Sequence, residues 1–233
     1  MGYRKSIARR EQAQHIEFLR QQAHRADKLD ITIEIKQCVY RNALFQTSAS
    51  LEVYVMTVLE DWLHKLKIEG KALKDVPKEL VFWTAAKLQT HAFREYLFQQ
   101  DEGKLVRKLS SINGLNLLFK DDSSAVNLTN FDNVRDRKYP SKKNLISLFR
   151  RFGIDNIMTE IHRKGARDYS SKLESFSDMR TEIAHQFPTP ELVIEDVNDI
   201  LLSIADIINQ IDRVLHSHVV SISGGICWKV SRL

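Results

Sequence analysis

The feature that most constrains the fold is a run of apolar residues near the C-terminus, spaced alternately by three and four positions. These residues are Ile194, Val197, Leu201, Ile204, Ile208, Ile211 and Leu215. Such spacing places them all on one face of a long α-helix. The apolar stripe is broadened by Val193, Ile200 and Ile207, which favours a helix in the core of a bundle over a coiled coil.

Helices are also predicted for most of the remaining chain, because its 233 residues include only 8 glycines and 4 prolines. Periodicity predicts one long helix over 31–66 and another from about Pro77 to Gln100. The second is expected to direct five apolar residues toward a core: Phe82, Ala85, Ala86, Phe93 and Leu97. A shorter helix is expected between Ser141, as its cap, and Gly153, as its stop.

Capping signals mark the last two helices, where Ser171 and Glu174 predict a capping box and Thr189-Pro190-Glu191 opens the helix that follows. The polar segment 113–140 is predicted to be a long loop, either a functional or a mobile insertion. Residues 3–28 are predicted to form an exposed helix, which could serve as a partner-binding arm. The chain is therefore expected to be an all-α, up-and-down helical bundle over 30–233, with a helical N-terminal extension over 1–29.

Composition narrows the class of protein. Apolar residues make up 43% and charged residues 28%, as in soluble globular proteins, and no apolar run is long enough to span a membrane. Cys38 and Cys227 lie too far apart in sequence to indicate a disulfide framework or a zinc knuckle. His216 and His218 point to different helix faces, and no nearby cysteine or acid completes a metal site with them. No nucleotide-binding glycine motif occurs. We expect a cytoplasmic protein without a metal or cofactor.

Positive charge is concentrated in one window of the chain. Residues 134–167 hold ten Lys and Arg against three acids, a local excess of +7, whereas the whole chain carries +5. Such an excess is typical of a protein that binds a polyanion, most often nucleic acid. The alternative is a solvated surface whose counter-charges lie elsewhere in the fold.

The stretch DMRTEIAHQF, 178–187, carries Arg180 and His185 on a predicted amphipathic helix. Its core face is formed by Leu173, Phe176, Met179, Ile183 and Phe187. Arg180 lies about 40° from the centre of that face, and His185 lies roughly 140° from Arg180, on the polar side. Taken alone, this pair could be a snorkelling arginine and an unremarkable surface histidine.

The R-x4-H pattern of Arg180 and His185 on a late helix resembles the signature of the HEPN superfamily of helical-bundle ribonucleases. The order of helices agrees, and KNLISLFRRFGI resembles the RiboL-PSP type of HEPN domain. The resemblance covers roughly residues 31–218. Members of the superfamily usually have Asn, Asp or His after the arginine and often Gly after the histidine, whereas this chain has Thr181 and Gln186.

The resemblance implies metal-independent cleavage of RNA by attack of the 2′-hydroxyl on the neighbouring phosphate. His185 would transfer the proton, and Arg180 would stabilise charge at phosphorus. Thr181 and Glu182 lie one turn before His185 and could fix the orientation of its ring. The basic window would bind RNA through Lys142, Lys143, Arg150 and Arg151.

A single histidine leaves the reaction short of a second acid–base group, so a two-fold homodimer that apposes the signature helices is expected. The resemblance also suggests a role in antiphage defence or as a toxin with an antitoxin partner. Two alternatives stay open. One is a non-catalytic HEPN module that binds RNA or a partner protein, and the other is a helical adaptor.

Overall fold

The computed structural model describes residues 2–112, 120, 122–125, 140–186 and 190–231. The helices are α1 (Ile7–Lys28), α2 (Ile33–Ile68), α3 (Lys78–Gln99), α4 (Glu102–Ser111), α5 (Lys142–Arg151), α6 (Ile157–Gly165), α7 (Tyr169–His185) and α8 (Ile194–Ser223), with short 3-10 turns at Leu73–Asp75 and Gly225–Cys227. Over these residues no strand forms, and only an isolated bridge joins Ala72 to Ser124. The predicted all-α helical bundle is confirmed.

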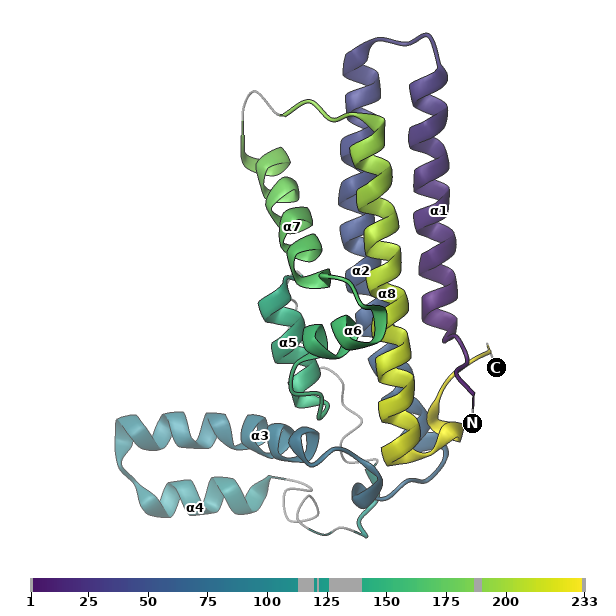
Figure 1. Cartoon of the computed structure of the whole chain (residues 1–233). Coiled ribbons are helices and arrows are strands. Elements are labelled where there is room, and N and C mark those ends of the chain that lie inside the picture. The colour runs from purple at the N-terminus through teal and green to yellow at the C-terminus, as the bar shows by residue number, and fades with distance from the viewer. Residues whose placement is uncertain (1, 113–119, 121, 126–139, 187–189, 232–233) are drawn as a thin grey trace.

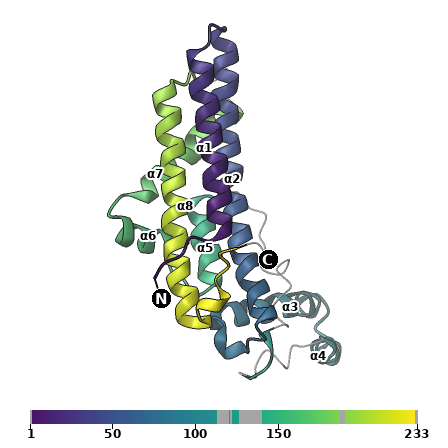
Figure 2. The same cartoon turned by 90° about the vertical axis from the view of Figure 1, so that its right-hand side faces the viewer.

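Three long helices, α1, α2 and α8, lie side by side along the length of the molecule (Figures 1 and 2). The shorter helices α5, α6 and α7 cover one side of this layer (Figure 1). The predicted apolar stripe of α8 forms the centre of the core, since Val197, Leu201, Ile204, Ile208, Ile211 and Leu215 are all buried. Periodicity alone therefore identified the helix around which the others pack.

Helix α1 is part of the bundle, so the expectation of an exposed arm is wrong. Its buried residues are Ala8, Ile16, Leu19, Ala23 and Ala26, which pack in the common core with residues of α2 and α8. The small alanines allow close approach of the neighbouring helices, and this is why the helix looked only weakly amphipathic in the sequence. Whether residues 1–29 form a separate extension stays a prediction.

A buried carboxylate anchors the start of α1. Asp212 of α8 is fully buried and accepts hydrogen bonds from the Tyr3 hydroxyl (2.8 Å), the Tyr54 hydroxyl (3.2 Å), and both the backbone N–H (3.1 Å) and the hydroxyl of Ser6. Burial, and then the neighbouring Asp212 carboxylate, raises the pKa of Tyr54 well above its usual value. The four donors satisfy the carboxylate that burial would otherwise leave without hydrogen bonds.

The predicted helix boundaries hold for α2, α3 and α5 within a few residues. Ser141 caps α5 as expected, and its side chain accepts a hydrogen bond from the backbone N–H of Asn144. The predicted start signals of α7 and α8 are wrong. Asp168, rather than Ser171, caps α7, and α8 begins only at Ile194, after an N-cap residue whose side chain makes no capping bond.

The prediction that α3 directs its apolar stripe into a core is wrong at most positions. Ala85 is buried, but Ala86 is exposed, and Phe82, Phe93 and Leu97 are 61%, 44% and 73% exposed. Helix α3 instead pairs with α4, which the sequence did not indicate, and this hairpin projects from the bundle (Figure 1). Helix α6 was not predicted either.

The predicted polar loop over 113–140 falls mostly outside the described residues. In its described part, the backbone N–H of Leu73 donates a hydrogen bond to the backbone carbonyl of Ser123 (2.8 Å). The backbone N–H of Ala125 donates to the backbone carbonyl of Lys71 (2.8 Å). These bonds attach the segment to the turn between α2 and α3. Throughout the described residues, no helix is both long and apolar enough to cross a membrane.

Candidate active site on helix α7

Helix α7 carries the R-x4-H pair and packs by the face that the sequence predicted. Leu173, Phe176 and Ile183 are buried, and Met179 is half-buried against the core. Phe187, the last expected member of this face, lies outside the described residues. Because these side chains fix the rotation of α7 about its own axis, they also fix the directions of Arg180 and His185.

Arg180 lies where α7 meets α2. It is half-buried, its Nε atom is enclosed, and its guanidinium carbon lies 5.8 Å from the centroid of the Phe45 ring on α2. This distance is within the range of a cation–π contact. The arginine therefore extends along the edge of the core, which agrees with its flanking position on the helical wheel.

His185 is the last residue of α7 and is exposed to solvent. Thr181 and Glu182, the two residues expected to orient its ring, are exposed as well. The Thr181 hydroxyl donates to the backbone carbonyl of Ser177 (2.8 Å), one turn back in its own helix. In the described part of the chain neither Thr181 nor Glu182 hydrogen-bonds the His185 ring, so their orienting role stays a prediction.

A second arginine, Arg41, shares this region and was not identified from the sequence. It lies one helical turn before Phe45 on α2, so the two side chains project from the same face of that helix. Arg41 is half-buried, and its enclosed Nε finds no acceptor among the described residues. Arg41 therefore lies on the face of α2 that carries the ring contacted by Arg180. The available signal was the i, i+4 spacing of Arg41 and Phe45 on a long helix.

The segment that follows α7 is tied to α2 by a reciprocal pair of hydrogen bonds. The Gln37 side-chain amide donates to the Leu192 carbonyl (2.7 Å), and the Leu192 N–H donates to the Gln37 side-chain oxygen (2.9 Å). Both groups are buried. This clamp fixes the place where the chain returns to the bundle after α7, close to the same end of α2 that carries Arg41.

The four predicted RNA-binding cations differ in their surroundings. Lys142 forms an ion pair with Glu174 of α7 (3.0 Å), and the Arg151 guanidinium carbon lies 4.0 Å from the Trp83 ring centroid on α3. Lys143 and Arg150 are exposed. The contact between Lys142 and Glu174 places the start of α5 beside α7. The remaining cations of the window that precede Pro140 lie outside the described residues.

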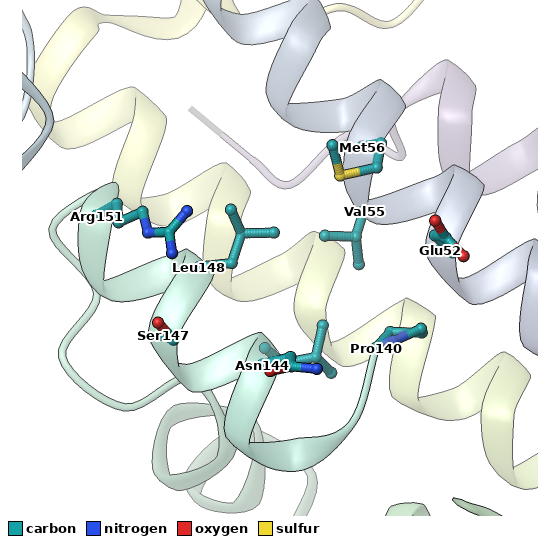
Figure 3. A pocket seen from close by; sticks show the side chains of 9 residues that line it. Glu52, Val55, Met56, Pro140, Asn144, Ser147, Leu148 and Arg151 are labelled. Atoms are coloured by element: carbon teal, nitrogen blue, oxygen red, sulfur yellow. The ribbon is translucent and has the colours of Figure 1, made fainter. Parts of the chain in front are cut away.

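A small cavity lies between α2 and α5 (Figure 3). Val55 and Met56 of α2 face Leu148 of α5 across it, and Arg151 and Glu52 lie at its two sides. Its volume of about 30 Å³ accommodates a water molecule but not a nucleotide.

A larger, polar hollow of about 540 Å³ lies between α6 and α8 and is lined in part by Lys164 and His218. The His218 ring hydrogen-bonds the carbonyl of Phe152 (2.7 Å), and burial lowers the pKa of His218. Lys164 donates to the Arg213 carbonyl (3.2 Å) and the Ser217 hydroxyl (2.8 Å). These bonds join α6 and the α5–α6 turn to α8.

Over the described residues, no three His, Cys, Asp or Glu side chains are grouped as a metal site.

The bundle, with an arginine and a histidine five positions apart on its penultimate helix, has the features of a HEPN-type domain. The model of the family described as RiboL-PSP-HEPN matches residues 8–217. The chain belongs to this family. The match begins at the second residue of α1, so the family pattern includes this helix. No curated protein and no solved structure matches the chain.

Proposed function

We propose that this protein is an endoribonuclease that cleaves RNA at α7. The observation that supports the proposal most strongly is the placement of Arg180 and His185 in a member of the RiboL-PSP-HEPN family. Arg180 extends along the α2–α7 contact, next to Phe45, whereas His185 is open to solvent at the end of the same helix. A guanidinium suits the stabilisation of charge at phosphorus, and an accessible imidazole suits proton transfer, so this pair supports phosphoryl transfer without a metal.

In the proposed reaction the 2′-oxygen of a ribose attacks the adjacent phosphorus as the bond from phosphorus to the 5′-oxygen breaks. The products are a 2′,3′-cyclic phosphate and a 5′-hydroxyl end. His185 takes the proton from the 2′-hydroxyl, and the departing 5′-oxygen receives a proton from water or from His185 of the second copy of the proposed homodimer. The Arg180 guanidinium donates hydrogen bonds to the phosphate oxygens on which negative charge accumulates.

The RNA is proposed to reach α7 over α5, where Lys143 and Arg150 are exposed and Lys142 contacts Glu174. Arg41 is proposed as a further phosphate-binding residue, because it projects from the same face of α2 as Phe45, whose ring Arg180 contacts. We further propose that the protein is a cytoplasmic homodimer that acts in antiphage defence or as the toxin of a toxin–antitoxin pair. The excess of positive charge over residues 134–167 is what favours RNA as the partner.

One observation favours the alternative of a non-catalytic HEPN module that binds RNA or a partner protein. The Thr181 hydroxyl donates to its own helix and leaves the His185 ring without support from that side. In this alternative, Arg180 and His185 would contribute to RNA binding without proton transfer. The two functions differ in whether the bound RNA is cleaved.

The decisive experiment incubates the purified chain with RNA in excess EDTA and analyses the ends of the products. The wild type should produce 2′,3′-cyclic phosphate ends, and His185→Ala should reduce cleavage by about 10²–10⁴-fold while it still binds RNA. His64→Ala, which removes another exposed histidine, is the matched control. RNA binding by the wild type without any cleavage would support the non-catalytic module instead.

A further inference from the structure

The projecting hairpin exposes an apolar stripe that the bundle does not cover. On α3 the stripe consists of Phe82, Ala86, Phe93 and Leu97, whose helical positions fall within about 60° of one another. Phe82, Phe93 and Leu97 are 61%, 44% and 73% exposed. Exposed apolar residues that line up on one helix face mark an interaction surface, whereas scattered ones do not.

The other faces of α3 are already occupied within the chain. Trp83 packs under the Arg151 guanidinium of α5, and Leu80 is fully buried. On the side toward α4, Glu95 forms ion pairs with Lys104 and Lys108. The stripe is thus the face of α3 that its contacts with the bundle and with α4 leave open.

The spacing of the stripe is symmetric about its middle. Phe82 and Ala86 are four positions apart, as are Phe93 and Leu97, and the midpoint of all four falls between residues 89 and 90. If two copies of α3 lie antiparallel, Phe82 comes opposite Leu97 of the second copy. Ala86 then comes opposite Phe93 of the second copy, so that a small side chain receives a large one. A two-fold interface requires this kind of self-complementarity.

We propose that the stripe on α3 is a self-association surface, where two copies of this chain pair as antiparallel α3 helices around a two-fold axis. Its polar residues fit the same register. Gln89, in the middle of the stripe, lies next to the axis, where its amide can hydrogen-bond the same residue of the second copy. A polar residue in an apolar seam fixes register in paired helices.

Charge at the ends of α3 also agrees with antiparallel pairing. Lys78 begins α3, and Asp101, which caps α4, follows the C-cap residue of α3, so antiparallel pairing brings the Lys78 end of one copy to the Asp101 end of the other. Opposite charges in these positions favour the antiparallel over the parallel arrangement. The hairpin that carries the stripe extends away from α1, α2 and α8 (Figure 1).

This contact differs from the dimer expected from the sequence, in which the α7 helices meet. The outward residues of α7 are polar, among them Lys172, Glu174, Asp178 and Glu182, and they offer no apolar anchor of the kind present on α3. The inference about α3 does not depend on ribonuclease activity, since no residue of α7 takes part. Assembly and RNA cleavage can therefore be measured independently.

The first test is the mass of the full-length protein in solution, measured by light scattering over a series of concentrations. The wild type should be a dimer, and Ala86→Arg should raise the dimer dissociation constant by at least about tenfold, because it places a charge opposite Phe93. Phe98→Arg is the matched control. Phe98 is 89% exposed on the same helix but lies about 130° from the stripe, so this variant should remain dimeric.

Cross-linking with a short bismaleimide tests the register, in a Cys38→Ser background because Cys38 is exposed. Gln89→Cys should cross-link to itself. Phe82→Cys should cross-link to Leu97→Cys when the two proteins are mixed, and neither should do so alone. Self-linking of Phe82→Cys would show parallel pairing and overturn the proposal. A wild type that stays monomeric would overturn the proposal too. If such a monomer binds phosphatidylserine vesicles through the stripe, the stripe is a membrane-binding surface instead.

Discussion

The guanidinium of Arg180 on α7 lies against the ring of Phe45 on α2, with 5.8 Å between the guanidinium carbon and the ring centroid. This contact joins two helices whose residues are far apart in sequence. It also holds a cation at the edge of the core, on the face of α2 from which a second arginine, Arg41, projects. The proposed chemistry therefore depends on how α7 packs on α2 as well as on the R-x4-H spacing.

The first prediction concerns the shape of the Arg180 side chain. Arg180→Lys keeps the positive charge but loses the planar donor fork that two phosphate oxygens can share. We expect RNA cleavage to fall by about 10²-fold or more, with a smaller loss of RNA affinity, because the fork acts mainly on the transition state. Single-turnover cleavage and filter binding measure the two effects. Arg25→Lys on the exposed side of α1 is the control, and an equal loss in both variants would contradict the assignment.

A second prediction concerns Arg41. Arg41→Met should weaken RNA binding and reduce the slope of log affinity against log salt by about one, as loss of one phosphate contact does. The melting temperature should not fall. The enclosed Nε has no acceptor in the described part of the chain, and an apolar side chain removes the cost of burying a donor without an acceptor. Unchanged affinity together with an unchanged slope would show that Arg41 has a packing role only.

The third prediction separates the cations of α5. The double variant Lys143→Gln, Arg150→Gln should lower the salt slope of RNA binding by about two, since both side chains are exposed. A matched pair on α1, Arg25→Gln with Lys28→Gln, should change the slope much less. Lys142 and Arg151 are left unchanged, because their contacts with Glu174 and Trp83 hold α5 in place. If the two double variants behave alike, α5 is not the path of the RNA.

A fourth prediction concerns the attachment of α1. Asp212→Asn should lower the free energy of unfolding by about 1–3 kcal/mol, because an amide cannot accept all the hydrogen bonds from Tyr3, Ser6 and Tyr54. Hydrogen exchange should rise most in the first turns of α1. Asp199→Asn, at an exposed position of the same helix, is the comparison. Equal stability of the two variants would mean that α1 is held by its apolar face alone.

The fifth prediction concerns pH. Burial lowers the pKa of His218, so below about pH 6.5 the unfolded chain takes up a proton that the folded protein resists. The free energy of unfolding should therefore fall as the pH drops from about 7.5 to about 5, an interval that brackets the usual histidine pKa. His218→Gln can keep the hydrogen bond to the Phe152 carbonyl, and its melting temperature should fall less than that of the wild type over the same pH interval. A drop as large as that of the wild type would contradict the assignment to His218.

The sequence was sufficient for features that depend on one helix at a time. The apolar spacing of α8, the extent of α2, α3 and α5, and the cap at Ser141 all follow from local geometry, which the chain carries within a few turns. The half-buried Arg180 and the exposed His185 follow in the same way from their angles around α7. Their roles in catalysis stay predictions.

Only the tertiary structure decided which apolar faces would meet a partner. The faces of α1 and α3 both carry apolar residues, but the face of α1 is buried in the common core. Asp212, far away on α8, holds the start of α1 by accepting hydrogen bonds from the hydroxyls of Tyr3 and Ser6. The stripe of α3 stays exposed because α3 instead pairs with α4 and leaves the bundle. The pairing of Gln37 with Leu192 and the approach of Arg180 to Phe45 likewise join residues far apart in the chain. Periodicity identifies a face that can be buried, but what covers that face depends on distant contacts that no local pattern contains.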